Sequence, residues 1–191
     1  MSVRIGLTGG IGSGKSVVAR LLMLMGVPVY NCDEEARRLM LTCPTIRREL
    51  TALLGQQVYR EGRLNKPLIA SYLFASADHA GRINAIVHPQ VRLDFRRWAS
   101  LHSDEPIVAM ESAILIEAGF TSEVDRLVEV YAPLEVRTRR IMARDRISRS
   151  QALERIASQM DEEEKRRQAD FVIINDGKTA VIPLCEQAIV L

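Results

Sequence analysis

The stretch LTGGIGSGKSV, residues 7–17, carries four glycines and ends in a lysine, a serine and a valine. Gly9 to Ser16 matches the pattern G-x-x-x-x-G-K-[ST], which is typical of loops that bind the phosphates of a nucleoside triphosphate. Glycine tolerates positive φ, so consecutive backbone N–H groups of such a loop can point at one anion. In this pattern Lys15 reaches the β- and γ-phosphates, and the Ser16 hydroxyl binds Mg²⁺. The stretch therefore predicts a nucleoside triphosphate site.

The sequence around this loop predicts an α/β fold. An apolar run at residues 3–7 predicts a strand before the loop, and residues 15–25 carry apolar side chains at helical spacing after it. Four further apolar runs predict strands, at residues 27–30, 107–110, 127–131 and 171–175. Strands that alternate with helices are typical of a mostly parallel sheet with helices on both faces.

Residues 43–102 differ from the rest of the chain, because no strand-like apolar run occurs there. Three prolines in this stretch, Pro44, Pro67 and Pro89, each stand near an expected helix start. Proline is favoured there, because its missing N–H would have had no partner in the helix. We therefore expect a mainly helical insertion in the α/β core.

Composition and charge exclude several classes of protein. The chain has 191 residues, 47% hydrophobic and 26% charged, which fits one globular domain with insertions and excludes disorder. A net charge of +2 gives no sign of nucleic-acid binding. The N-terminal apolar stretch is interrupted by Arg4 and fits neither a signal peptide nor a membrane span. The three cysteines fit no metal-ligand spacing, so we expect reduced thiols and a cytoplasmic location.

Among proteins with this loop, a small-molecule kinase is favoured over a switch GTPase or a transport ATPase. The stretch DHAG, residues 78–81, matches D-x-x-G but falls in the helical insertion, and NKPL, residues 65–68, lacks the aspartate of a guanine-binding motif. The sequence contains no L-S-G-G-Q signature. A kinase needs an acceptor pocket, a base beside the acceptor hydroxyl and cations over the phosphoryl group, and the chain offers candidates for all three.

An ordered set of motifs resembles that of the dephospho-CoA kinases. After GLTGGIGSGKS come an aspartate beyond the second strand, Asp33, then INAIVHPQV, RRIMARD, RIASQM and KRRQADFVIINDG. The resemblance covers most of the chain. It implies a P-loop NTPase fold of the nucleotide-kinase branch and ATP-dependent phosphorylation of the 3′-hydroxyl on the ribose of dephospho-coenzyme A, the last step of coenzyme A synthesis.

The resemblance also implies the site residues. Lys15, Arg140 and a general base, Asp33, would be catalytic, and Ser16 would bind the Mg²⁺ that accompanies ATP. The residues that would bind ATP are Gly10, Ile11, Gly12, Ser13, Gly14, Lys15, Ser16, Val17, Arg144 and Asn175. Those that would bind the acceptor are Thr8, Asp33, Lys66 and His88. No nucleic-acid polymer and no membrane take part in this reaction.

Three positions depart from the family's usual pattern. Asn31 replaces the first aspartate of D-A-D, and Val17 replaces a threonine but keeps its backbone N–H for the α-phosphate. Lys66 replaces an arginine, which keeps the charge but loses the bidentate geometry that arginine offers to phosphate.

An arginine-rich segment, residues 137–149, contains six arginines and one acid. Arg137, Arg140 and Arg144 fall on one helical face, and like charges repel unless an anion meets them, so we expect this face to contact phosphate. Residues 147–166 would form a helical lid that carries Arg155 and Gln159 inward. We expect the acidic run at residues 161–164 to be a solvated surface.

Other interpretations of three candidates stay open. Asp33 suits a helix N-cap as well as a base, and His88 suits a helix start ahead of Pro89 as well as a substrate contact. Glu111 follows the expected strand at 107–110 and suits a structural role as well as water-mediated Mg²⁺ binding. The glutamate that the family carries in this neighbourhood corresponds to Glu117.

The sequence thus predicts three parts. Residues 1–42, 103–146 and 167–191 would form the nucleotide-binding core, residues 43–102 the acceptor-binding insertion, and residues 147–166 the lid. A kinase of another nucleoside or nucleotide, and a nucleotide-dependent switch without acceptor chemistry, are the alternative functions. The sequence gives no indication of the oligomeric state.

Overall fold

A computed structural model describes residues 2–190 of the chain, with side chains except those of Phe74 and Ala77. The chain divides into two compact units. The first unit contains the residues up to Asn31 together with those from Trp98 onward, and the second is Cys32–Arg97. The helical insertion expected at residues 43–102 overlaps the second unit, which begins eleven residues earlier than expected.

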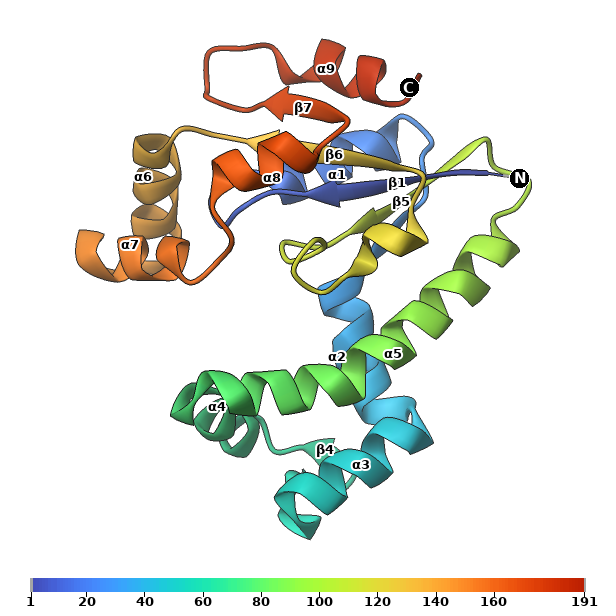
Figure 1. Cartoon of the computed structure of the whole chain (residues 1–191), viewed down its shortest axis with the longest axis vertical. Coiled ribbons are helices and arrows are strands. Elements are labelled where there is room, and N and C mark those ends of the chain that lie inside the picture. The colour runs from blue at the N-terminus through green and yellow to red at the C-terminus, as the bar shows by residue number, and fades with distance from the viewer. Residues whose placement is uncertain (1, 191) are drawn as a thin grey trace. The chain divides into compact units, whose positions relative to one another are not determined.

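The first unit is built on a five-stranded sheet in the order β2-β5-β1-β6-β7 (Figure 1). Its strands are β1 (Val3–Thr8), β2 (Val29–Asn31), β5 (Ile107–Glu111), β6 (Arg126–Tyr131) and β7 (Phe171–Ile174). All four neighbouring pairs are parallel, which confirms the predicted sheet. Because the strands are parallel, their carboxyl ends share one edge of the sheet, and in open α/β folds ligands bind at that edge.

Two helices, α1 (Lys15–Leu24) and α9 (Val181–Ala188), cover one face of the sheet, and α8 (Glu162–Gln168) lies on the other face against β6 (Figure 1). Val128 and Val130 on β6 pack with Val18 and Leu22 of α1 in the core under the first face. Side chains alternate along a strand, so Glu129, between these two valines, points to the face that α8 covers. The sequence therefore places a buried glutamate beneath α8.

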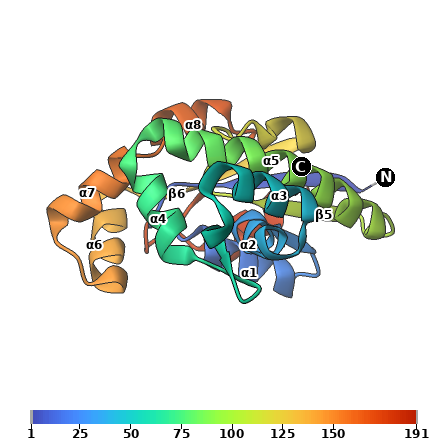
Figure 2. The ribbon, with the colours of Figure 1, turned by 90° about the horizontal axis from the view of Figure 1, so that it is seen from below.

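Two further helices, α6 (Leu134–Asp145) and α7 (Arg149–Ala157), follow β6 and pack against each other (Figure 2). Arg146 ends α6 in the left-handed conformation, with φ of 54°. A capping box begins α7, because the Ser148 hydroxyl accepts from the Gln151 N–H and the Gln151 side chain accepts from the Ser148 N–H. A short 3₁₀ helix, η2 (Phe120–Glu123), precedes β6.

The second unit is mainly helical, as predicted. Its elements are α2 (Cys32–Thr42), α3 (Pro44–Leu54), η1 (Gln56–Val58), β3 (Tyr59–Arg60), β4 (Arg63–Leu64), α4 (Lys66–Ala75) and most of α5 (Ala77–Leu101). Pro44 and Pro67 lie in the first turns of α3 and α4, which confirms two of the three predicted helix starts. The short antiparallel hairpin of β3 and β4 was not predicted.

The third predicted helix start, at Pro89, is wrong, because Pro89 lies inside α5. Proline removes one backbone hydrogen bond from a helix. Here an apolar stripe continues on both sides of it, and its members Ile83, Val87, Val91 and Phe95 are all buried. Burial of this stripe outweighs the lost hydrogen bond, so the helix runs through the proline.

Across residues 2–190, the helices all lack the combination of length and apolar character that crossing a membrane requires.

Candidate active site

The glycine-rich loop joins β1 to α1 at the carboxyl edge of the sheet. Gly12 and Gly14 have φ angles of 82° and 92°, a region that side chains with a Cβ rarely adopt. Gly14 is the N-cap of α1, and its carbonyl accepts from the N–H groups of Val17 and Val18. Lys15 begins the helix, so the positive end of the α1 dipole faces the same space as the loop amides.

Lys15 forms an ion pair with Glu111, the last residue of β5. β5 is the neighbour of β1, and the register sets Glu111 beside Leu7, two residues before the loop. The other oxygen of Glu111 accepts from the Asn31 Nδ2 at 2.6 Å. Glu111 thus holds Lys15 at the mouth of the loop, and Asn31, the departure from the family's D-A-D pattern, fixes Glu111.

A second set of contacts holds the outer side of the loop. Arg140 on α6 donates to the carbonyls of Gly12 at 3.3 Å and Ser13 at 3.1 Å. Asn175, just after β7, donates to the Ser13 carbonyl at 2.8 Å and accepts from Arg140 at 3.3 Å. These contacts fix the backbone of the turn, in which the Ser13 N–H also donates to the Gly10 carbonyl at 3.0 Å.

Arg137 contacts the loop backbone and not open solvent, since 2% of its surface is exposed. Its Nε donates to the Ile11 carbonyl at 3.0 Å, and Nη1 lies 3.3 Å from Oε1 of Glu162. The Ile11 N–H donates to Oε1 of Gln159 at 2.7 Å. Gln159, which the sequence predicts to point inward from the lid, thus contacts the loop backbone.

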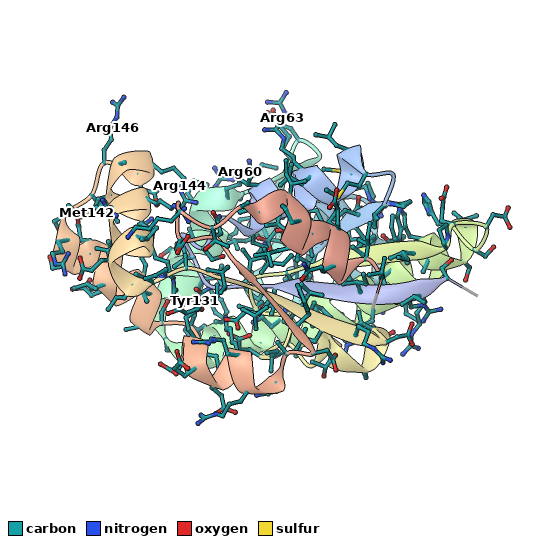
Figure 3. The ribbon with its side chains drawn as sticks, turned by 90° about the horizontal axis from the view of Figure 1, so that it is seen from above. Arg60, Arg63, Tyr131, Met142, Arg144 and Arg146 are labelled. Carbon is teal, nitrogen blue, oxygen red and sulfur yellow. The ribbon has the colours of Figure 1, made fainter. Side chains whose placement is uncertain are left out.

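Acids pair with several arginines of the arginine-rich segment, so Arg137 and Arg144 on the predicted face are not unpaired cations: Glu162 of α8 pairs with Arg137, and Asp145 of α6 pairs with Arg144. Asp145 pairs with Arg144 at 2.7 Å and with Arg155 at 2.5 Å, and Glu135 pairs with Arg149 at 2.6 Å. Arg155 is therefore turned toward Asp145 in this structure, and half of its side chain is exposed. Figure 3 shows the side chain of Arg146 extending away from the end of α6.

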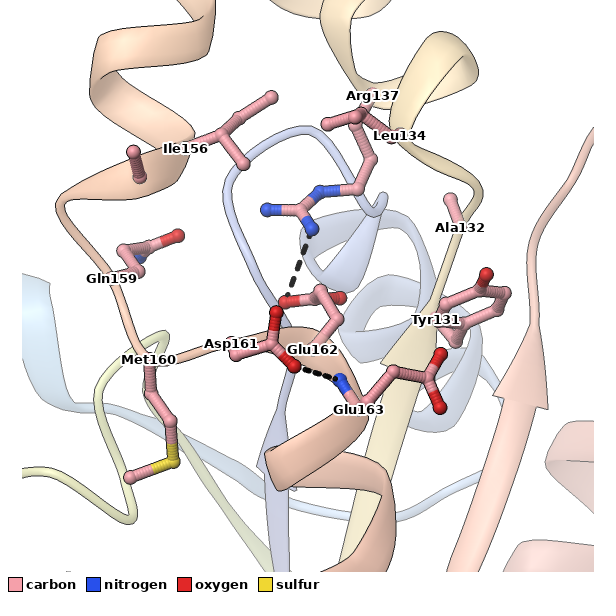
Figure 4. Close-up of a pocket in the computed structure, with 11 residues that line it drawn as sticks. Tyr131, Ala132, Leu134, Arg137, Ile156, Gln159, Met160, Asp161, Glu162 and Glu163 are labelled. Carbon is pink, nitrogen blue, oxygen red and sulfur yellow. Dashed lines mark hydrogen bonds and ion pairs between the residues drawn. The ribbon is translucent and has the colours of Figure 1, made fainter.

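The acidic run at residues 161–164 is only partly a solvated surface, so that expectation is wrong for one member. Asp161 caps α8 by accepting from the N–H groups of Glu163 and Glu164. Glu162 is turned inward to Arg137 (Figure 4), and both its carboxylate oxygens are buried. An isolated run of four acids gives no sign of which one pairs with an arginine 25 positions earlier, so the sequence did not reveal this contact.

The remaining predicted residues of the first unit differ in exposure. Ser16 and Val17 are exposed at the start of α1, so the Ser16 hydroxyl is accessible to a metal ion. Thr8 and Ser13 are fully buried, and among residues 2–190 neither hydroxyl has a hydrogen-bond partner. Arg144 is exposed and lies one helical turn beyond Arg140.

The other predicted residues, Asp33, Lys66 and His88, belong to the second unit. Asp33 is exposed in the first turn of α2, inside the helix and not at its N-cap. Lys66 is exposed at the start of α4. His88 lies in the middle of α5, where burial and the neighbouring Arg92 lower its pKa below the usual value, which favours the neutral imidazole.

Comparison with known proteins identifies close relatives. The family model described as "Dephospho-CoA kinase" matches residues 3–180. The chain is 55% identical to the dephospho-CoA kinase of Bacteroides fragilis over 183 residues, which cover 96% of this chain and 89% of that protein. It is 40% identical to the dephospho-CoA kinase of Porphyromonas gingivalis over 182 residues, which cover 95% of this chain and 90% of that protein.

Solved structures share the fold. The crystal structure of TT1252 from Thermus thermophilus is similar with a TM-score of 0.81 and 37% identity, over 98% of this chain and 94% of that one. A dephospho-CoA kinase from Campylobacter jejuni has a TM-score of 0.72 and 23% identity, over 99% of this chain and 96% of that one. Shikimate kinase from Acinetobacter baumannii has a TM-score of 0.54 and 19% identity, over 98% of this chain and 91% of that one, so the two chains share a fold.

Proposed function

The chain belongs to the dephospho-CoA kinase family, and from this membership we propose how its residues divide the work of the reaction. That reaction transfers a phosphoryl group from ATP to the ribose 3′-hydroxyl of dephospho-coenzyme A and gives coenzyme A and ADP, the final step of coenzyme A biosynthesis. The observation that carries the assignment is the glycine loop at the start of α1, with Lys15 held at its mouth by Glu111.

We propose that residues 10–17 bind the ATP phosphates. The loop amides would surround the β-phosphate, and Lys15 would leave Glu111 in part to reach the β- and γ-phosphates. Arg140 and Arg144 would face the phosphates from α6. Asn175 would place the following segment beside the adenine ring.

The residues at the loop fit a bound Mg²⁺, which would neutralise charge on the β- and γ-phosphates. Ser16 offers an exposed hydroxyl at the helix start, and the carboxylate of Glu111 lies beside Lys15 at the end of β5. Magnesium keeps several waters and takes few protein ligands besides phosphate oxygens. We therefore propose that Ser16 would bind it directly and Glu111 through water.

We propose that residues 43–102 hold the acceptor. Asp33 would orient the 3′-hydroxyl and accept its proton, and Lys66 and His88 would contact dephospho-coenzyme A. The predicted contact of Thr8 with the acceptor does not fit this structure, because Thr8 is fully buried. Neutral His88 suits a hydrogen bond to a polar group of the acceptor. Phosphoryl transfer has a loose, highly charged transition state, so positioning by these groups and the cations of Lys15 and Arg140 would supply most of the catalysis.

We propose that residues 147–166 close over ATP and exclude water, which would otherwise accept the phosphoryl group. Within this stretch α7 would move further than α8, because the ammonium of Lys165 on α8 is fully buried against Glu117 at 3.1 Å and the Ala113 carbonyl at 3.0 Å. We further propose a cytoplasmic location, where thiols stay reduced, since all three cysteines are free.

An acceptor panel tests this function. The enzyme is incubated with ATP and Mg²⁺ and either dephospho-coenzyme A, AMP, CMP, pantetheine or no acceptor, and ADP and the phosphorylated product are measured. We expect ADP release to depend on dephospho-coenzyme A alone. Equal turnover of AMP or CMP would favour a nucleotide kinase, and slow ADP release that ignores every acceptor would favour a switch.

A further inference from the structure

A second charged cluster lies beneath α8, outside the residues assigned to ATP and acceptor. Glu129, at the centre of β6, is 0% exposed, and no residue described between 2 and 190 donates a hydrogen bond to either carboxylate oxygen. Glu162 faces it from α8, and its own oxygens are equally buried. A buried carboxylate without a donor is strongly disfavoured as an anion.

The charges around the pair do not balance if both glutamates are ionised. Arg137 faces the cluster from α6 and Lys165 from α8, whereas Glu129, Glu162 and the Lys165 partner Glu117 supply three carboxylates. Two other charged residues of α8 also face Glu129. They are Glu163 and Arg166, and they pair with each other at 3.0 Å. Asp161, whose negative charge also raises the pKa of Glu162, is exposed at the N-cap of α8. One added proton would therefore neutralise the buried cluster.

The two glutamates differ in what each can contact. Glu162 pairs with Arg137 and lines a pocket of about 360 Å³, whereas Glu129 has neither a cationic partner within ion-pair distance nor a place in the pocket wall (Figure 4). Burial and the nearby Glu162 raise the pKa of Glu129 to about 8, and burial raises that of Glu162 despite Arg137. Since Glu162 has a cationic partner and neither oxygen of Glu129 has a hydrogen-bond partner among the described residues, Glu129 is the member of the pair better suited to hold a proton, and Glu162 the one better suited to carry the charge.

Charged Glu162 is in contact with the glycine loop. Its carboxylate and the Arg137 guanidinium lie so close to Gly10 that a Cβ at this position would overlap both. The Gly10 amide favours the charged form of Glu162, although it does not reach full hydrogen-bond geometry. Arg137 in turn binds the Ile11 carbonyl. A change in charge at Glu162 is thus transmitted to Gly10 directly and to Ile11 through Arg137.

We propose that Glu129 and Glu162 share one proton. While Glu129 holds this proton, Glu162 is charged and acts as a positioning residue, which keeps Gly10 and Ile11 in the geometry that binds ATP. When Glu129 ionises, repulsion between the two carboxylates displaces Glu162 and loosens this part of the loop. The inference rests on the proposal that the loop binds ATP, and it adds a dependence of ATP affinity on pH.

The sign of the effect on stability follows from the same pair. A carboxyl group whose pKa is higher in the folded than in the unfolded protein stabilises the fold at low pH, and this stability is lost as pH rises toward the folded pKa. For Glu129 this stability is lost as the pH rises from the ordinary pKa of 4.5 to the raised pKa of about 8. Replacement by glutamine, which stays neutral, removes the loss.

The test compares wild type with Glu129→Gln, Glu162→Gln and Glu186→Gln from pH 6 to 9. Glu186→Gln is the matched control, because it removes the same charge from an exposed residue of α9, away from the cluster. The readouts are KM for ATP and kcat, and the melting temperature without ATP. Ratios of variant to wild type at each pH cancel the titration of ATP itself.

We expect Glu162→Gln to raise KM for ATP about tenfold at pH 7 with kcat within about twofold, the scale of one lost contact to a charged group. Glu186→Gln should change KM for ATP and kcat by less than about twofold. From pH 7 to 9 the wild-type KM for ATP should rise about fivefold or more relative to that of Glu129→Gln, whose melting temperature should exceed that of wild type at pH 8 and above.

A Glu162→Gln variant with the KM of wild type, or a Glu129→Gln variant that keeps the wild-type dependence of KM on pH, would overturn the proposal. A Glu129→Gln variant that fails to fold would contradict it too, because a neutral residue is expected to stabilise that position. The melting temperatures are measured without ATP, so they test the shared proton even if the loop assignment fails. If Glu162→Gln folds poorly, the pH profile of Glu129→Gln decides alone.

Discussion

At the scale of single residues, Lys15 is held in position before ATP arrives. Glu111 binds its ammonium, and Asn31 fixes Glu111 from β2. A lysine side chain has four rotatable bonds, and ordering it costs about 1.5 to 2 kcal/mol of rotamer entropy. Because folding already orders part of the Lys15 side chain, less rotamer entropy is lost when ATP binds.

Lys15→Ala should lower kcat/KM by on the order of a hundredfold or more, because a cation is lost from the β- and γ-phosphates. The fold should persist with reduced stability, because Glu111 keeps its hydrogen bond from Asn31 but loses its cationic partner. Initial rates with ATP and dephospho-coenzyme A measure the effect. Arg20→Ala, which removes an exposed cation from the same helix, is the control, and equal rates in both variants would refute the assignment of the loop.

Asp33 and Glu111 are the carboxylates that we propose as base and as Mg²⁺ contact, and a Mg²⁺ titration distinguishes their roles. Asp33→Asn should lower kcat roughly a hundredfold or more while ATP still binds, the scale of a lost base. Glu111→Gln should mainly raise the Mg²⁺ concentration that gives half the maximal rate. The roles are reversed if excess Mg²⁺ cannot restore Glu111→Gln and Asp33→Asn loses little.

At the scale of elements, the sequence predicted those whose signal is local. The order of strand, loop and helix at the glycine loop, together with the buried apolar runs, was sufficient to predict all five strands of the sheet. The Pro89 prediction failed because a proline is a local signal, whereas the apolar stripe of α5 that overrides it extends over several turns. A two-residue strand pair such as β3–β4 is too short for any periodicity to show.

In the site, two residues that motifs predict to lie near ATP are in contact with the loop, whereas no sign in the sequence indicated the pairings between distant elements. Gln159 and Asn175 were expected near ATP, and both bind the loop backbone. The pairs of Arg137 with Glu162 and of Arg155 with Asp145 depend on how α6, α7 and α8 pack. A charge count along one segment cannot show a counter-ion that comes from another.

Trypsin should distinguish α7 from the elements around it. Arg146, Arg149 and Arg155 are exposed in and before α7, and ATP with acceptor should slow cleavage there severalfold because closure orders the segment. The products are identified by mass spectrometry over a time course. Cleavage at Arg126, at the amino end of β6, serves as the reference, and an unchanged ratio between the two regions would show that α7 does not close.

At the scale of the whole molecule, stability depends on a few buried charges more than on the many exposed ion pairs. Lys165 is fully buried with Glu117 and a carbonyl as its partners, whereas Arg167, on the same helix, pairs with Glu164 in solvent. Removal of one partner leaves an uncompensated charge in the first case and a hydrated one in the second.

Lys165→Ala should therefore lower the free energy of unfolding by about 3 to 5 kcal/mol, the range for a broken buried pair. Arg167→Ala should change it by less than about 1 kcal/mol. Urea denaturation followed by circular dichroism gives both values. Similar losses in the two variants would mean that Lys165 is solvated in the folded protein.

The contact between Asn175 and the Ser13 carbonyl spans 162 residues, and it bears on how the enzyme is made. A ribosome delivers the chain from its N-terminal side, so the glycine loop emerges well before the residues that restrain it. Until those residues are made, the loop lacks Arg140 and Asn175, the side chains that bind its carbonyls. A nascent chain therefore displays the motif without the pocket, and it acquires affinity for nucleotide only when its last strand has joined the sheet.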